Sequence, residues 1–202
     1  MKKTNYLAIL FLIIGIAATS CKKDNNTIKE YGTSVNATEK LLTLPIYDPV
    51  SYVNNGGRNR GYEFKSSKNG RITEIGARTS TGIYTVTLWD SSAQTILKSV
   101  NVSSSDANSF SYSDVDDINI QANKVYVITV NNATVGSGIT TSAVFYGITT
   151  GANYLPQTVG DITYLASVEK STLNPSSLFP YTFSPEHDIV MGMPTFKFEP
   201  KL

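Results

Sequence analysis

The chain has 202 residues, of which 41% are hydrophobic and 16% charged, and its formal net charge at pH 7 is +1. Its Lys and Arg residues form no basic block of the kind that a nucleic-acid-binding surface needs, which argues against DNA or RNA as a partner. A single cysteine excludes an internal disulfide and a cysteine-based metal cluster.

The first twenty residues have the layout of a secretory signal peptide. Lys2 and Lys3 provide a positive start, an apolar run extends from Tyr6 to Ala18, and small residues lead to Cys21. The apolar run is shorter than the roughly 20 residues that cross a bilayer as a helix, so a permanent transmembrane anchor is the weaker alternative. Because cleavage before Cys21 removes two lysines and no acid, 15 Lys and Arg would remain against 16 Asp and Glu.

The cleavage site, Ala18-Thr19-Ser20-Cys21, resembles the lipobox of bacterial lipoproteins, in which the cysteine becomes the first mature residue and is acylated. Ala18 stands where the motif usually has leucine. The resemblance implies a lipid on Cys21, and two or more acyl chains hold a protein stably at a membrane. Lys22 stands where some bacteria use aspartate to retain lipoproteins at the inner membrane. The resemblance therefore implies an outer-membrane lipoprotein of the cell envelope, on its inner face or exposed at the cell surface.

We predict that residues 1–20 are the signal peptide, that residues 21–40 are the lipidated cysteine and a polar tether, and that residues 41–202 form a single domain. The segment 25–40 is poor in apolar residues, as linkers are. Leu41–Val53 is apolar but contains Pro45 and Pro49, which favours an edge strand or a packed extended segment over a central strand.

Three strands are predicted within the stretch Gly61–Asp90. They are Gly61–Lys65, Arg71–Arg78 and Ile83–Trp89. Asn69-Gly70 between the first two is a strong β-hairpin signal. In the second strand Ile72 and Ile75 break strict alternation, so either a β-bulge or burial on both faces is expected there.

The strand Ile83–Trp89 has the clearest period of two. Tyr84, Val86 and Leu88 point one way, and the residues between them point the other. Trp89 lies on this strong strand, so we interpret it as a core or subsurface residue.

Further strands follow at spacings of roughly 8–12 residues, and no segment after the leader shows a convincing helical stripe. The candidates are Thr95–Val102, Phe110–Tyr112, Ile118–Ile120, Lys124–Asn131, Ala143–Gly147, Ile162–Val168, Asp188–Met193 and Thr195–Phe198. Nine or ten short strands with intervening turns predict an all-β fold, an antiparallel β-sandwich of jelly-roll type.

The run from Gly61 to Asn131 resembles an uncharacterised bacterial β-sandwich family, a domain of unknown function found in secreted and cell-surface proteins. The resemblance rests on the motifs GYEF, NGRITEIGAR, YTVTLWD and ANKVYVITVN. Members often stand beside adhesion-like or carbohydrate-active modules. The shared motifs are core and turn patterns, so they imply a fold and transfer no catalytic residue.

Catalytic and metal-binding patterns are weak. His187 is the only histidine, no G-x-S-x-G motif occurs, and we therefore predict that the protein is not an enzyme. A pair of carboxylates in a cleft, as in glycoside hydrolases, stays open as an alternative. Asp114, Asp116 and Asp117 form the densest acidic group. They are a candidate for a structural calcium site, against the more ordinary interpretation as a solvated polar loop.

The chain is rich in aromatic residues, with 12 tyrosines, 8 phenylalanines and 1 tryptophan. An aromatic ring can stack on the C–H face of a sugar while nearby polar side chains bind its hydroxyls. The candidate ligand-binding residues, all in predicted loops or late strands, are Tyr146, Asn153, Tyr154, Asp161, Tyr164, Phe179, Tyr181 and Phe183, with Gln157 as a further polar neighbour. The alternative for the segment 179–183 is packing over the sandwich.

The sequence thus predicts a lipid-anchored, non-catalytic binding module that recognises a glycan or another surface macromolecule. Two alternatives remain: a structural or adhesion subunit that contacts proteins, and an enzyme that processes glycans. The predicted partners are the membrane, through Cys21, and a glycan or surface protein. No cofactor is expected beyond the possible calcium ion.

Overall fold

The computed structural model describes residues 30–44, 51–53, 58–106, 108–131, 133–134, 138–139, 142–146, 155–171, 179–180, 182–183, 189–191 and 193–202. One short helix, α2, spans Ala37–Leu42. The strands are β1 Val35–Asn36, β2 Ser51–Val53, β3 Arg58–Ser66, β4 Gly70–Ala77, β5 Gly82–Asp90, β6 Thr95–Ser104, β7 Ser111–Ile120, β8 Val125–Asn131, β9 Ala133–Thr134, β10 Gly138–Ile139, β11 Ser142–Tyr146, β12 Gln157–Val159, β13 Ile162–Ser171, β14 Thr182–Phe183, β15 Ile189–Met191 and β16 Pro194–Pro200.

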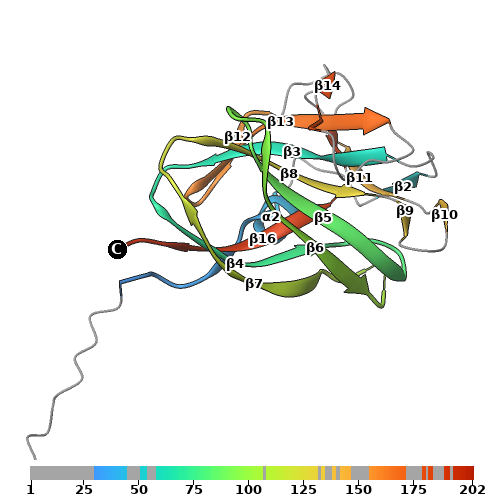
Figure 1. Cartoon of the computed structure of the whole chain (residues 1–202), viewed down its shortest axis with the longest axis horizontal. Coiled ribbons are helices and arrows are strands. Elements are labelled where there is room, and N and C mark those ends of the chain that lie inside the picture. Colours follow the sequence, from blue (N-terminus) through green and yellow to red (C-terminus); the bar gives the residue numbers. More distant parts are fainter. Residues whose placement is uncertain are drawn as a thin grey trace, which may run out of the picture.

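Two antiparallel sheets pack face to face (Figure 1). One has the order β1-β16-β4-β7, and the other has the order β12-β13-β3-β8-β5-β6, with β14 added to β13. Four pairings, β1 with β16, β3 with β8, β4 with β7 and β5 with β6, are those of one long hairpin rolled into a double sheet. This is the jelly-roll arrangement, and the predicted fold class is confirmed.

The two ends of the sandwich differ. A small sheet, β15-β11-β2, and the pair β9-β10 lie at one end, to the right in Figure 1. At the other end the first described residues meet the C-terminus, because the Leu202 amide donates to the Glu30 carbonyl at 3.1 Å and Tyr31 forms a β-bridge with Lys201. The turns after β3 and β7 lie at this second end, which we call the terminal end.

The core between the sheets follows the predicted alternation of β5. Tyr84, Val86 and Leu88 are completely buried, and they belong to the main hydrophobic cluster. Phe64 of β3 packs against Phe196 of β16 across the two sheets, with ring centroids 4.5 Å apart. Aromatic pairs of this kind contribute about 1 kcal/mol beyond the area that they bury.

A second, smaller cluster lies on the outer face of the larger sheet. Trp89, Val127 and Val168 form it together with Phe179, whose ring meets the Trp89 ring edge-on at 5.7 Å. The indole Nε1 of Trp89 donates to Thr129 Oγ1 at 3.2 Å. The interpretation of Trp89 as a subsurface residue is confirmed. Phe179 packs over the sandwich, which is the alternative given above for the segment 179–183.

The Asn69-Gly70 turn is not a hairpin, and that prediction is wrong. β3 pairs with β8 and β13, while β4 pairs with β16 and β7 in the other sheet. Because both edges of each strand are occupied by other partners, the turn carries the chain from one sheet to the other. Within β4, the register against β7 shifts between Ile72 and Glu74, and both Ile72 and Ile75 are buried. A β-bulge therefore explains their odd spacing.

The packed structure also begins before the predicted boundary at Leu41. β1 pairs with β16, and Asn36 caps helix α2 by accepting a hydrogen bond from the Glu39 amide at 3.2 Å. Leu41 is 1% exposed and belongs to the core, at the end of a helix instead of in an extended segment. The residues 30–40, which the prediction places in the tether, therefore belong at least in part to the folded domain.

Candidate functional site

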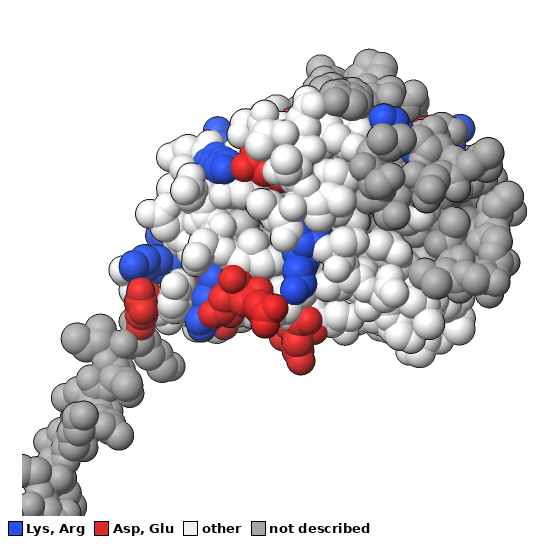
Figure 2. Space-filling view, in the orientation of Figure 1, with Lys and Arg blue, Asp and Glu red and all other residues white. Residues whose placement is uncertain are grey.

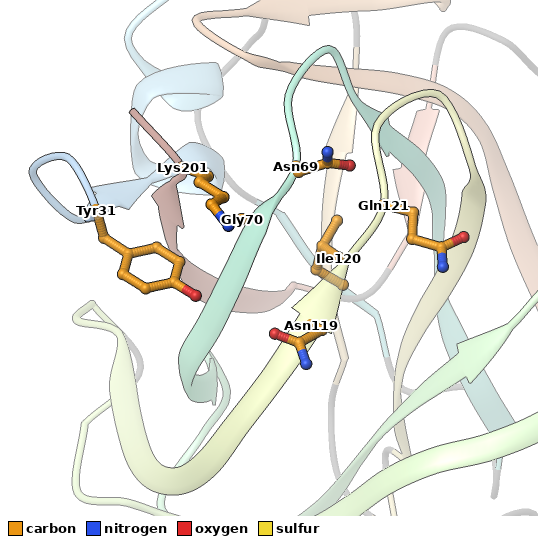
Figure 3. Close-up of a pocket in the computed structure, with 7 residues that line it drawn as sticks. All are labelled: Tyr31, Asn69, Gly70, Asn119, Ile120, Gln121 and Lys201. Atoms are coloured by element: carbon orange, nitrogen blue, oxygen red, sulfur yellow. The ribbon is translucent and has the colours of Figure 1, made fainter.

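A polar hollow of about 530 Å³ lies at the terminal end of the sandwich (Figure 3). Four segments far apart in the sequence supply its walls. Its lining residues are Tyr31, Asn69, Gly70, Asn119, Ile120, Gln121 and Lys201. In the view of Figure 3, Tyr31 and Gln121 bound it on opposite sides.

Asn69 joins the segments that form the hollow. Its backbone carbonyl accepts a hydrogen bond from the Lys201 amide at 2.8 Å, and its side-chain Oδ1 accepts one from the Ala122 amide, also at 2.8 Å. Gly70 beside it is pressed against β16, since an added Cβ would lie 2.4 Å from the Glu199 carbonyl oxygen. Only glycine permits this close approach.

A cation lies over the Tyr31 ring. The Arg71 guanidinium carbon lies 4.1 Å from the centre of the Tyr31 ring, a cation–π contact. Arg71 is itself held by Glu199, with Nε–Oε2 at 2.8 Å, and by Asp117, with Nη1–Oδ2 at 2.5 Å. One face of the ring thus contacts a side chain that two carboxylates fix in place.

The charges around the hollow compensate one another. Lys201 pairs with Glu30 at 3.2 Å, and the Arg71 charge is matched by the carboxylates of Glu199 and Asp117. The groups left to face a ligand are the carboxamides of Asn119 and Gln121 together with the Tyr31 ring. Each carboxamide offers two donors and an acceptor, which suits the hydroxyl groups of an uncharged molecule.

Two of the predicted binding aromatics are not at the surface, and the prediction is wrong for them. Tyr164 is 0% exposed and packs against Tyr62 in the core, with ring centroids 4.9 Å apart. Phe179 is 7% exposed because its ring covers Trp89. A ring whose faces are occupied by protein cannot stack on a sugar.

Asp161 has a structural contact. Its Oδ1 accepts a hydrogen bond from Ser67 Oγ at 3.1 Å, and its Oδ2 lies 3.6 Å from Lys68 Nζ. Its backbone carbonyl also accepts from the Ser67 amide at 2.8 Å. These contacts join the β12–β13 turn to the loop after β3, and they place Asp161 outside the lining of the hollow.

The structure describes the other predicted ligand-binding residues only in part. Asn153, Tyr154 and Tyr181 fall outside the described residues. Tyr146 ends β11 and Phe183 lies in β14, and for these two only the backbone is described. Gln157 lies in β12, where its side chain donates to the Thr158 carbonyl at 3.3 Å.

The three aspartates of the calcium prediction lie on β7 and have separate partners. Asp116 pairs with Lys98 at 3.3 Å, Asp117 pairs with Arg71, and Asp114 lies opposite Glu74 in the sheet. Figure 2 shows acidic side chains over β4 and β7 with Lys and Arg atoms beside them. Among the described residues, no three His, Cys, Asp or Glu side chains converge on a possible metal position. Calcium binding stays a prediction for calorimetric titration to test.

The carboxylates near the hollow belong to one ion-pair network. Asp117 and Glu199 both pair with the Arg71 guanidinium on the outer side of the smaller sheet. The glycan-processing alternative stays a prediction. His187 lies outside the described residues.

No protein-family model and no curated protein matches this chain. The likeness of Gly61–Asn131 to an uncharacterised sandwich family therefore stays a prediction. Among the described residues, no helix is long and apolar enough to cross a membrane.

No sequence pattern points directly to the hollow. Tyr31 falls in the predicted tether, and Asn69 falls in a predicted turn. Asn119, Gln121 and Lys201 are exposed polar residues near strand ends, a pattern that most surfaces share. One usable signal is the N-cap pattern of Asn36 and Glu39, which indicates that the folded chain begins before Leu41. Tyr31 then lies only five positions before the N-cap residue of the helix.

Proposed function

We propose that this protein is a non-catalytic binding module of the cell envelope, held at the outer membrane by a lipid on Cys21, and that it binds a glycan in the polar hollow. The observation that carries the proposal is the composition of the hollow. Carboxamides and one aromatic ring line a cavity of about 530 Å³ in which neighbouring charges are compensated. A few oriented polar groups around a concave surface are what a small-molecule or sugar site needs.

The lining residues would have separate roles in binding and in folding. The carboxamides of Asn119 and Gln121 would bind ligand hydroxyls, and the Tyr31 ring would contact the apolar face of a sugar. Asn69 holds the segments together, since both its side-chain and backbone oxygens are hydrogen-bonded within the protein. Binding is thus expected to depend on Asn119 and Gln121, and folding on Asn69.

A glycan array tests the proposal with lipidated protein solubilised from membranes in detergent. We expect a subset of glycans to be retained, and we expect Asn119→Ala and Gln121→Ala each to weaken binding about 10-fold, the effect of roughly one lost hydrogen bond. Asn108→Ala is the matched control, because Asn108 is an exposed carboxamide in the β6–β7 loop, away from the hollow. Retention of no glycan, or equal binding by all three variants and the wild type, would refute the proposal.

The second candidate function is adhesion through protein contacts at β6. This ten-residue strand ends the larger sheet, and Ile96 and Leu97 are 43% and 40% exposed there. An exposed sheet edge can accept a strand from another protein. A photo-reactive residue at position 97 in intact cells would trap one stoichiometric protein partner if this function is the correct one.

A further inference from the structure

The hollow opens beside the place where the chain enters the folded domain. Tyr31 lines it, and the preceding residue, Glu30, forms an ion pair with the lining residue Lys201. The Glu30 carbonyl also accepts a hydrogen bond from the Leu202 amide. The position of the hollow relative to a membrane is therefore set by the short segment before Glu30.

That segment is short compared with the domain. Glu30 lies nine positions after Cys21, and an extended chain advances at most about 3.5 Å per residue, so the segment spans at most about 30 Å. The nine-residue strand β3 alone is also about 30 Å long. A lipid on Cys21 would keep the terminal end within about 30 Å of the bilayer and would leave the β2–β11–β15 end free to point away from it (Figure 1).

Charge compensation narrows the chemistry of the ligand. Close to the hollow, Lys201 pairs with Glu30, Lys68 with Asp161, and Arg71 with Glu199 and Asp117. A phosphate-binding site presents cations or backbone amides to the anion, whereas each of these cations already has an acidic partner. The hollow therefore suits an uncharged group with many hydroxyls.

We infer that the ligand of the hollow is the neutral sugar head group of a glycolipid in the same membrane that holds the protein. This inference rests on the proposed function and adds the location and charge of the ligand. A head group in the same bilayer lies within the reach of the tether. A head group on an opposing membrane would meet the β2–β11–β15 end first.

The inference can be tested with lipidated protein in phosphatidylcholine vesicles. The probes are photo-activatable diacylglycerol glycosides of glucose, galactose and mannose, placed either in the protein's own vesicles or in separate ones. We expect cross-linking in the same vesicle to exceed that between vesicles at least 10-fold, with attachment sites in the segments around Tyr31 and 119–121. Asn119→Ala should reduce it about 10-fold, and Asn108→Ala should leave it unchanged.

Tether length supplies an independent control. A 30-residue Gly/Ser insertion between Asn25 and Asn26 would let the hollow face away from the protein's own membrane. Cross-linking between vesicles should then rise toward the value measured within one vesicle. Equal cross-linking in both arrangements without the insertion would overturn the inference.

Charge and the source of the sugar define the remaining outcomes. Stronger labelling by a photo-activatable phosphatidylglycerol than by the glycosides would overturn the neutral-ligand assignment. If free methyl glycosides bind in the hollow but none of the glycolipids cross-links, the inference fails and the proposed function stands. If neither free sugars nor glycolipids bind, both fail.

Discussion

Replacing Phe179 separates the packing role that the structure assigns to it from the ligand-binding role that its sequence context favours. The Phe179 ring is 7% exposed and covers the indole of Trp89 on the outer face of the larger sheet. In Phe179→Ala the ring is lost, and the cluster with Val127 and Val168 opens to solvent. The variant should therefore lose stability and keep its ability to bind a glycan in the hollow.

The size of the effect follows from burial. Replacing a buried phenylalanine with alanine costs about 3–5 kcal/mol. Because the described cluster is small, with four members, we expect the lower value, about 3 kcal/mol. For a domain of 150–250 residues this corresponds to a decrease in Tm of about 6–12 °C. Phe179→Leu, which keeps most of the apolar volume, should recover more than half of the loss.

The assay uses the only tryptophan of the chain as a reporter. Trp89 is 1% exposed, so its emission should shift to longer wavelength in folded Phe179→Ala, and urea denaturation should report the lost stability. Phe196→Ala is the matched control, because Phe196 packs on the opposite face of the sheet and should lower stability without changing the emission of the folded state. Unchanged stability and emission, combined with a loss of glycan binding, would refute the packing role.

Three further predictions concern pH dependence and close packing. Burial raises the pKa of Glu63, so the folded state disfavours its carboxylate, and the free energy of unfolding falls as the pH rises from about 4.5. Glu63→Gln should therefore be more stable than the wild type at pH 7. Urea midpoints of variant and wild type that change in parallel between pH 4 and 7 would contradict this. The Lys124 ammonium, 2.6 Å away, lowers the pKa of Asp90, so this ion pair stabilises the protein above pH 3.8 and the benefit disappears as the pH falls. Asp90→Asn should lose about 1 kcal/mol at pH 7 and much less at pH 2, as measured by urea denaturation. Gly70→Ala forces a Cβ against the β16 backbone and should lower Tm by more than Gly160→Ala does. At Gly160 an added Cβ meets nothing within 4 Å, and the only cost is about 1 kcal/mol from the φ of +60°. Equal melting temperatures of the two variants would contradict the close contact at Gly70.

The strands could be predicted because their signal is local. Tyr84, Val86 and Leu88 alternate with more polar residues, and a strand with one face in a core requires this pattern whatever its neighbours are. The same reasoning placed Trp89 on the other side of the strand. It could not show that the face holding Trp89 is covered by Phe179, since that contact joins residues 90 positions apart.

Local sequence signals could not predict which strands pair with one another. Asn69-Gly70 has the residues that tight hairpins use, yet β3 and β4 lie in different sheets. A turn motif makes a reversal of the chain easy without deciding whether the two strands also pair. In this protein the long-range pairings of β3 with β8 and of β4 with β16 occupy the edges that a local hairpin would need.

The candidate site could not be predicted for the same physical reason. Tyr31, Asn119 and Lys201 are brought together only because β1, β7 and β16 belong to one sheet. The aromatic-rich segments after Gly147 fit a sugar site as well as a core, because aromatic residues serve both. Tyr164 and Phe179 show that, at these two positions, the rings serve packing.

The placement of the hollow at strand ends separates binding from folding. Asn119 and Gln121 are exposed, whereas Ile120 between them is 2% exposed and belongs to the core. Since an exposed polar side chain contributes little to stability, Asn119→Ala should change the free energy of unfolding by less than about 0.5 kcal/mol while it abolishes most binding. Ile120→Ala should cost about 2–5 kcal/mol. If Asn119→Ala destabilised the domain as strongly as Ile120→Ala, Asn119 would be part of the framework, and the hollow would lose the residue on which its proposed specificity depends.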